Sequence, residues 1–428
     1  MAPCWACARW EAFVPRGAAA RMGVVLGRLS RYLPRALFSR IKPPIRYAPP
    51  VDLFFTPAFG QLFPAEQYTL APVFYLIEQH TSRRERVLEE LIEWILARQD
   101  SEGSWFSVNF ITALATLALR AAMEATPRPR LDRAYARARE WLEQTRNPDG
   151  GHREAADLNV WDTALSVLAL LRSGMPARSA PIRRATDWLV SVQNLDGGWA
   201  FHGRRASDLL SDADDTALAT WALLETGRHP VAAGRGVAWL ADHQGKDGSW
   251  ATYRPGVGDV GCVSVTARAI QVLAQVGERR RAERGLRWLR RVQANDGSWD
   301  DLWLARRTYG TAMALIAMAR LDAFDRRTVE RGIQWLLKHQ RPDGGWGETQ
   351  RGEPRSSTAE QTAFAVRALL AWGRSADRGL EWLLKHQRPD GGWDPAPIGI
   401  YWEVIGGYAN PINGWVFPLL ALSEEPEG

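Results

Sequence analysis

The stretch QRPDGGW at residues 340–346 recurs unchanged at residues 387–393, which is 47 residues further along the chain. Its Asp-Gly and Gly-Gly steps supply the positive φ that ends a helix, while its Gln and Trp side chains can bridge neighbouring units. We therefore expect a turn between two helices at each copy. Divergent copies, the second of them degenerate, occupy residues 99–105, 146–152, 193–199, 244–250 and 293–299.

A tryptophan followed by Leu or Ile precedes each of these turns, and these anchors recur every 47 to 51 residues. The anchors and turns together account for 13 of the 21 tryptophans, so a repeat explains the high count. The anchor tryptophans are Trp94, Trp141, Trp188, Trp239, Trp288, Trp335 and Trp382.

A helix rich in small residues follows most of the turns, and it begins in register with a Thr-Ala pair. Helices such as 217–224 can approach one another closely, which fits an inner layer. Trp-Leu helices such as 183–192 have one apolar and one charged face, which fits an outer layer. Seven two-helix units predict an all-α repeat fold, either an open solenoid or a closed α/α toroid. The Thr-Ala pairs begin at Thr112, Thr163, Thr216, Thr266, Thr311 and Thr362.

Length and composition indicate a globular protein, since 428 residues with 46% hydrophobic content can bury a sizeable core. No run of 18 apolar residues and no signal-peptide pattern is visible, so we expect an intracellular protein. Three cysteines cannot form a disulfide framework. Cys4 and Cys7 form a CxxC pair, but no second ligand pair accompanies it, and we expect no metal site there.

Residues 1–48 hold nine basic residues and a single acid, Glu11. Between Arg21 and Arg46 the basic residues alternate with apolar ones, a pattern that suits either a segment on an anionic membrane surface or an ordinary surface helix. Nucleic acid is a weaker alternative because no binding module accompanies the charge.

The repeated Gln-x-x-x-Gly-(Ser/Gly)-Trp turn, together with Asp212-Ala213-Asp214-Asp215, resembles the squalene-hopene and oxidosqualene cyclase family. The resemblance extends from about residue 50 to the terminal Trp415-Val416-Phe417-Pro418. It implies a closed α/α barrel with a second, partial α-helical domain. We assign residues 1–145 to the basic segment and reduced second domain, and residues 146–428 to the catalytic barrel. The chain is shorter than the family norm at its N-terminus, so we expect either a reduced domain or a start inside a longer reading frame.

That resemblance implies a class II terpene cyclase, in which an acid protonates a linear polyprenyl chain such as squalene and starts its cyclisation. Protonating an alkene needs a strong acid held away from water, and clustered buried carboxyl groups resist full ionisation. The resemblance makes Asp214 the proton donor, with Asp212 and Asp215 shaping its acidity. A helix N-cap would explain one of these acids but not all three.

Arg268 stands two residues beyond Thr266, where the family often places a histidine beside the catalytic acid. An arginine on an apolar inner face is costly unless it is paired. We expect it to pair with Asp212 or Asp215 and leave Asp214 as the acid, or to mark altered chemistry. Ser264, where the family often has an acid, also departs from the pattern.

Aromatic faces can stabilise a carbocation without capturing it. By position against the family, the residues expected to line the pocket are Trp161, Phe201, Tyr253, Trp303, Tyr309, Trp402 and Tyr408. Protonation needs no cofactor and no metal. If the substrate carried a diphosphate, Mg²⁺ could assist, and the arginines able to hold it are Arg204, Arg205, Arg254, Arg306 and Arg307.

The family resemblance also implies peripheral, monotopic attachment to the cytoplasmic face of a membrane, with a hydrophobic polyprenyl substrate as partner. A homo-oligomer stays open. Three other functions compete with the squalene-hopene type. They are a class II cyclase of a shorter prenyl diphosphate or meroterpenoid, a zinc-dependent prenyltransferase β-subunit, and a non-catalytic toroidal binding module. The zinc alternative ranks low because only Cys262 lies in the repeats, without convincing ligand spacing.

Overall fold

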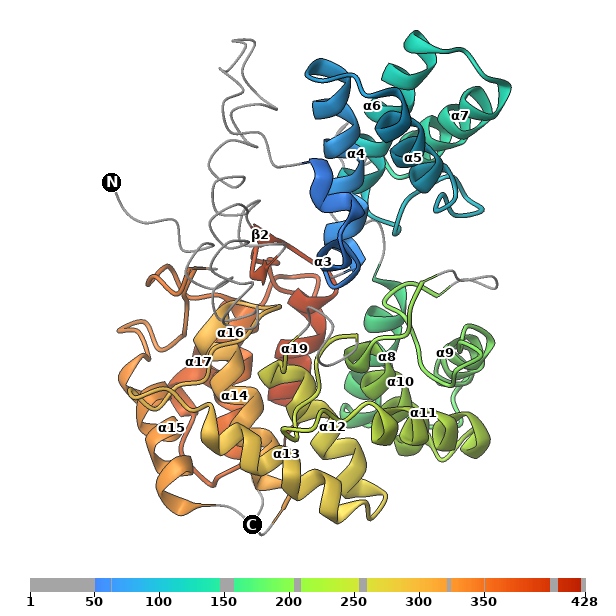
Figure 1. Ribbon diagram of the computed structural model, residues 1–428. Coiled ribbons are helices and arrows are strands. Elements are labelled where there is room, and N and C mark those ends of the chain that lie inside the picture. Colours follow the sequence, from blue (N-terminus) through green and yellow to red (C-terminus); the bar gives the residue numbers. More distant parts are fainter. Residues whose placement is uncertain are drawn as a thin grey trace. The chain divides into compact units, whose positions relative to one another are not determined.

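The computed structural model describes residues 51–62, 64–146, 158–203, 209–253, 260–321, 325–349, 351–400 and 407–424. Its contacts divide the chain into two compact units (Figure 1). Unit 1 is Met1–Asp157 with Val257–Asp259, and unit 2 is Leu158–Gly256 with Val260–Gly428.

Unit 1 is helical throughout its described part. Helix α4 packs against α5 and α6, and α6 packs against α7. Trp94 lies at the centre of an aromatic cluster, with the rings of Phe59 and Tyr68 at 5.8 and 5.4 Å between centroids. The elements are η1 (Val51–Phe55), α3 (Pro57–Gly60), α4 (Pro64–His80), α5 (Glu85–Leu96), α6 (Asn109–Ala125) and α7 (Pro129–Gln144).

Unit 2 alternates inner and outer helices. Its inner helices are α8 (Asn159–Arg172), α10 (Ala213–Thr226), α12 (Val263–Gln275), α14 (Arg306–Ala319), α16 (Ala359–Leu370) and α19 (Asn413–Leu422). Its outer helices are α9 (Ala180–Ser191), α11 (Pro230–Asp242), α13 (Arg279–Arg291), α15 (Arg326–Lys338) and α17 (Asp377–Lys385). The short strands β1 (Gly399–Ile400) and β2 (Gly407–Tyr408) pair antiparallel before α19.

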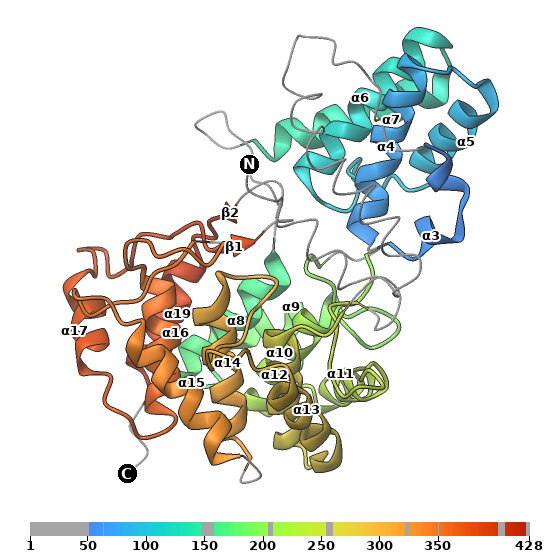
Figure 2. The same ribbon diagram turned by 60° about the vertical axis from the view of Figure 1, so that its left-hand side comes forward.

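The inner helices form a closed ring. Each packs against the next in the order α8, α10, α12, α14, α16 and α19, and α19 then packs against α8. The outer helices lie around this ring, where Figures 1 and 2 show α11, α13, α15 and α17 at the periphery. The predicted all-α fold and its two layers are therefore confirmed. Closure, which periodicity left undecided, depends on the contact between the last helix and the first.

Four of the Gln-Trp turns, those of Gln99, Gln193, Gln244 and Gln293, join three elements through hydrogen bonds. The Gln193 side chain donates to the carbonyls of Gly197 (2.8 Å), in its own turn, and Ala232 (2.9 Å), in the next outer helix. The Trp199 indole N–H donates to the carbonyl of Leu189 at 2.7 Å, which fastens the turn to the helix before it. Equivalent indole bonds recur at Trp105, Trp250, Trp299, Trp346 and Trp393.

The threonine of each Thr-Ala pair anchors the inner helix that follows. The backbone N–H of Trp199 donates to the Thr216 hydroxyl at 2.9 Å, and that of Trp250 donates to Thr266 at 2.9 Å. Because the same bond recurs in successive repeats, equivalent residues of the inner helices lie at the same level of the barrel. The repeat therefore determines the level of equivalent residues along the barrel as well as the fold of each unit.

Candidate active site

The turn that contains Trp199 positions the acidic motif. The Trp199 carbonyl accepts a hydrogen bond from the Asp212 backbone N–H at 2.8 Å, and its own N–H binds Thr216. Helix α10 begins directly after Asp212, whose carboxylate caps the helix by accepting from the Asp215 N–H at 2.8 Å. The capping role therefore uses one acid, Asp212, and leaves Asp214 and Asp215 for other contacts.

All three carboxyl groups of the motif are buried, and each residue is at most 6% exposed. Burial raises the pKa of Asp212 to about 8. Burial, followed by the charges of Asp212 and Asp214, raises the pKa of Asp215 well above its usual range. One oxygen of Asp215, Oδ1, has no hydrogen-bond partner. A buried carboxyl group in this setting favours its protonated form.

Arg268 on α12 pairs with Asp214, not with Asp212 or Asp215 as expected from the sequence. Its guanidinium donates to Asp214 Oδ1 and to the Tyr309 hydroxyl, and it lies 4.5 Å from the Trp161 ring centroid. Burial raises the pKa of Asp214, while the charge of Arg268 opposes that rise. Asp214 and Asp215 both occupy the first turn of α10, which packs directly against α12, and the Asp214 side chain is the one that reaches Arg268.

Asp301, which the sequence analysis did not single out, completes the buried charges. Its side chain accepts hydrogen bonds from the backbone N–H groups of Ser264 and Trp303, both at 2.9 Å, and it is fully buried. Burial raises the pKa of the Cys262 thiol and of Asp214, and the charge of Asp301 adds to both increases. An acid therefore reaches the N-terminus of α12 from another repeat, although position 264 itself is a serine. In the sequence, only its place at the end of a Trp-Asp-Asp run after a turn marks Asp301.

Two of the expected aromatic residues, Trp161 and Tyr309, meet at Arg268. Trp161 also donates its indole N–H to Asn413 at 3.1 Å, and Tyr309 packs on Phe364 at 4.6 Å between ring centroids. Trp303 lies at the edge of the same site, because it follows Asp301 and donates to the Thr252 hydroxyl at 2.9 Å.

Of the other expected aromatic residues, Phe201, Tyr253 and Tyr408 lie in the described part of the chain. The Phe201 carbonyl accepts from Val160 at 3.3 Å, Tyr253 is buried, and Tyr408 in β2 packs closely on Gly399. Trp402 lies outside the described residues.

Of the arginines proposed to hold a diphosphate, Arg306 and Arg307 lie in the described part of the chain. Arg306 makes two hydrogen bonds to Asp300, at 2.9 and 3.0 Å, and Arg307 lies 3.3 Å from Asp296. Both are therefore already engaged with carboxylates. Arg204, Arg205 and Arg254 lie outside the described residues, as do Cys4 and Cys7 and the whole basic segment.

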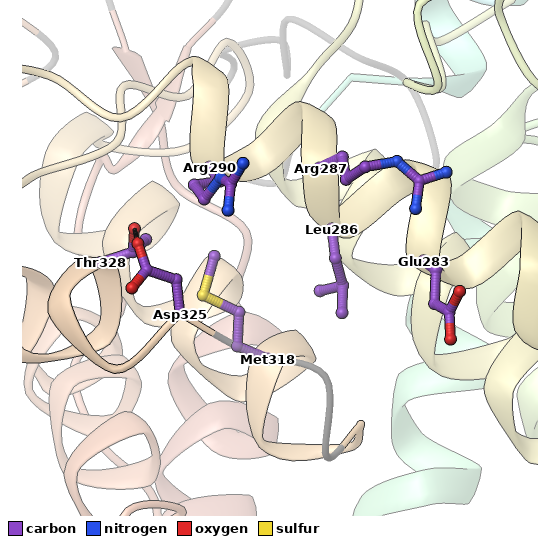
Figure 3. Close-up of a pocket in the computed structure, with 7 residues that line it drawn as sticks. All are labelled: Glu283, Leu286, Arg287, Arg290, Met318, Asp325 and Thr328. Carbon is purple, nitrogen blue, oxygen red and sulfur yellow. Dashed lines mark hydrogen bonds between the residues drawn. The ribbon is translucent and has the colours of Figure 1, made fainter.

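A pocket of about 220 Å³ opens between α13, α14 and the start of α15 (Figure 3). Charged side chains line much of it, and only Leu286 and Met318 are apolar. Met318 lies nine residues after Tyr309 on α14, which corresponds to about 13 Å along the helix. This pocket is therefore remote from the acids and has the wrong lining for a polyene.

The described ranges of the chain bear on metal binding and on membrane crossing. Within those ranges, no group of His, Cys, Asp and Glu side chains could hold a metal ion. None of the helices described there combines the length and the apolar character needed to cross a membrane.

Known proteins resemble the chain along most of its length. It matches the squalene-hopene cyclase C-terminal domain family over residues 64–159, 159–258 and 254–424. A squalene-hopene cyclase of Alicyclobacillus acidocaldarius is 31% identical over 193 residues. That alignment covers 41% of this chain and 30% of the enzyme, so the chain matches less than a third of its relative's length.

Solved structures share the fold. A protein from Actinoplanes has a TM-score of 0.51 and 23% identity, over 66% of this chain and 96% of that chain. The type II terpene cyclase MstE from Scytonema has a TM-score of 0.51 and 22% identity, over 65% and 89%. An MstE variant in complex with its substrate geranylgeranyl dihydroxybenzoate has a TM-score of 0.50 and 19% identity, over 86% and 98%. The family match and the closed barrel agree, and the chain belongs to the squalene-hopene cyclase C-terminal domain family, a family of class II terpene cyclases.

Proposed function

We propose that this protein is a squalene-hopene-type cyclase, which protonates a linear polyprenyl substrate and directs its cyclisation. The observation that carries the proposal is the burial of three carboxyl groups, Asp212, Asp214 and Asp215, at the N-terminus of one inner helix of a closed barrel. Three buried acids exceed what a helix cap needs, and such clusters are typical of sites that hold a proton against water.

The proton to be delivered is held on Asp215 rather than on Asp214. The family resemblance assigns it to Asp214, but a carboxyl group that contacts a guanidinium favours its ionised form. Among the described residues, no cation forms a hydrogen bond with Asp215, and its Oδ1 has no hydrogen-bond partner there. In the first step its O–H bond breaks and the proton bonds to one alkene carbon. The π electrons form that C–H bond, and the other alkene carbon becomes cationic.

The pair of Arg268 and Asp214 has a different task. An unpaired arginine would repel the developing carbocation, whereas an ionised Asp214 beside it makes the pair neutral overall. Arg268 also fixes the Tyr309 hydroxyl, and Trp161 adds a buried aromatic ring. Aromatic faces at this level favour a cation and offer no nucleophile.

An apolar substrate suits the surfaces of the inner helices next to the acidic motif. The residues two positions after the repeat threonines include Leu218, Met313 and Phe364, all buried. Protonation by a carboxyl group requires no cofactor, and Mg²⁺ would be involved only with a diphosphate substrate. Residues 146–428 would form the catalytic barrel and residues 1–145 the reduced second domain, with peripheral membrane contact delivering the substrate.

The test incubates the purified protein with squalene, farnesyl diphosphate, geranylgeranyl diphosphate and geranylgeranyl dihydroxybenzoate, and identifies products by mass spectrometry. We expect cyclised product from the wild type and a loss of at least 1,000-fold, roughly the scale of a deleted acid, with Asp215→Asn. Equal product from Asp215→Asn would refute Asp215 as the proton donor, and no product from any polyprenyl substrate would refute the proposed cyclase. The substrate that reacts also decides between squalene and the shorter prenyl or meroterpenoid class.

A double variant separates the two acids. Asp214→Asn with Arg268→Gln replaces the ion pair by neutral groups of similar size, so it removes no net charge from the site. If Asp215 is the donor, this variant retains measurable cyclisation. Complete loss in a folded double variant, with activity in Asp215→Asn, would return the role to Asp214.

A further inference from the structure

Glu360 occupies the same repeat position on α16 that Asp214 occupies on α10. Each lies two residues before the repeat threonine, Thr362 or Thr216. Both threonine hydroxyls accept the backbone N–H of the preceding turn's tryptophan, at 3.1 Å from Trp346 and 2.9 Å from Trp199. The two acids are therefore held at the same level of the barrel.

They also lie on opposite walls. In the closed ring, α10 and α16 are three helices apart in either direction. Packed helices have axes 8–10 Å apart, so opposite axes of a six-helix ring are about 16–20 Å apart. The helix axes that carry the two acids are therefore separated by the length of several carbon–carbon bonds. A substrate can lie between them, and the acids cannot bond directly to each other.

Only one oxygen of the Glu360 carboxylate forms a hydrogen bond with the described residues. Glu360 has no exposed surface, and its Oε1 accepts the backbone N–H of Ala396 at 2.8 Å. Its other oxygen, Oε2, is buried and has no hydrogen-bond partner among the described residues. Burial raises the pKa of Glu360 to about 7, so the group can exchange a proton near neutral pH. Buried polar atoms are nearly always paired, and an unpaired one calls for a specific explanation.

Another buried acid, Glu348, shows what a purely structural role looks like in this fold. Its Oε1 accepts the backbone N–H groups of Arg306 and Thr308, at 3.0 and 2.6 Å, at the start of α14. It thereby satisfies a helix N-terminus. Glu360 lies instead inside the first turn of α16, where Thr358 already provides the cap.

An aromatic wall lies next to Glu360. Phe364 follows it by one helical turn on α16, so both residues lie on the same side of that helix. The Phe364 ring contacts Tyr309 of α14 and Phe417 of α19, each at 4.6 Å between centroids. A carbocation that reaches this wall would be stabilised by the ring faces, beside an oxygen free to accept a proton.

We propose that Glu360 is the base that ends the cyclisation. The inference rests on the proposed function, because it needs a carbocation to act on. The bond between hydrogen and a carbon next to the cationic centre breaks, and its electron pair forms the new double bond. The proton passes to Oε2 of the ionised Glu360. The product is therefore an isomer of the substrate, with one alkene formed at the end and no water incorporated.

The experiment compares the wild type with Glu360→Gln and Glu348→Gln, using the substrate that the wild type converts. The glutamine at position 360 keeps an acceptor for the Ala396 N–H but cannot take up a proton. Reactions run in ¹⁸O-labelled water, and mass spectrometry separates alkene products from alcohols that carry the label. Circular dichroism and thermal unfolding establish that each variant is folded.

We expect Glu360→Gln to keep consuming substrate while its alkene product falls at least tenfold in share, replaced by labelled alcohols or misplaced alkenes. Glu348→Gln should change stability but not product identity. Glu360→Asp, which keeps a shorter carboxylate, should restore part of the original alkene. An unchanged product ratio in Glu360→Gln would overturn the inference, and so would a wild-type product that already contains oxygen from water. Absence of any wild-type product would instead refute the proposed function, and this inference with it.

Discussion

The guanidinium of Arg268 on α12 binds the carboxylate of Asp214 on α10, and both side chains are almost entirely buried. The two residues are 54 positions apart in the chain, and neighbouring inner helices bring them together. This pair changes the distribution of protons in the motif, since Asp214 is the counter-ion of Arg268, whereas Asp212 and Asp215 form no ion pair with a described residue.

Removing one partner of the pair should cost far more stability than removing both. Arg268→Gln leaves the carboxylate of Asp214 buried without its cation, and we expect the free energy of unfolding to fall by about 3–5 kcal/mol. The double variant with Asp214→Asn should lose clearly less than the sum of the single changes, because no buried charge stays uncompensated. Urea unfolding of the four proteins measures this coupling. Additive losses would show that the two groups do not interact.

The stability contributed by Glu360 should fall as pH rises. Its pKa is about 7 in the folded chain and 4.5 ordinarily, so the native state binds more protons than the unfolded state between those values. The free energy of unfolding therefore decreases with pH across this window. The Ala396 N–H, the Thr358 hydroxyl and the charge of Arg355 lower this pKa, and burial outweighs them.

The matched variant isolates that effect. Relative to wild type, Glu360→Gln should gain about 2–3 kcal/mol of unfolding free energy between pH 5 and pH 8, since glutamine does not titrate. Urea unfolding of both proteins at several pH values provides the measurement. A stability difference that stays constant over this range would contradict the raised pKa.

The glutamine of each turn should stabilise the barrel by joining adjacent repeats. Gln244 donates to the carbonyls of Gly248 and Arg281, both at 2.9 Å, and Arg281 belongs to the next outer helix. Gln244→Ala should lower the free energy of unfolding by about 1–3 kcal/mol, because two carbonyls lose their donor. Lys246→Ala in the same turn is the control, and its exposed side chain predicts a change within about 0.5 kcal/mol. Equal effects of the two variants would refute the bridging role.

Glycines of the outer helices should respond to alanine in opposite directions. A Cβ atom at Gly332 would come within 2.8 Å of the Trp299 ring, which is fully buried and cannot move aside. Gly332→Ala should therefore destabilise the protein by about 1–3 kcal/mol. At Gly234, on α11, no atom lies within 4 Å, and alanine should stabilise by about 0.5–1 kcal/mol. Thermal unfolding of both variants measures the sign, and a shared sign would contradict this packing.

Much of the barrel was predictable because its repeat is local. A Gln-Trp turn, an alanine-rich helix and a Trp-Leu helix each follow from about 47 neighbouring residues, and the structure confirms which helices are inner and which are outer. Similar reasoning applied to the glycines three residues before four of the anchor tryptophans, such as Gly332, would have located a packing contact. The acidic motif was also visible, because its three carboxylates are more than a helix N-cap explains.

The sequence by itself determined the helical layers, the register of the threonine anchors and the presence of acids at one end of an inner helix. Only the tertiary structure decided that the ring closes through α19, that Arg268 pairs with Asp214, and that α16, which carries Glu360, lies opposite α10, which carries Asp214. The position of Asp301 was also decided only by the tertiary structure, because this residue reaches the N-terminus of α12 from 37 residues away in the chain. The physical reason is that turns and helices depend on near neighbours, whereas the partner of a buried charge depends on which helices pack together.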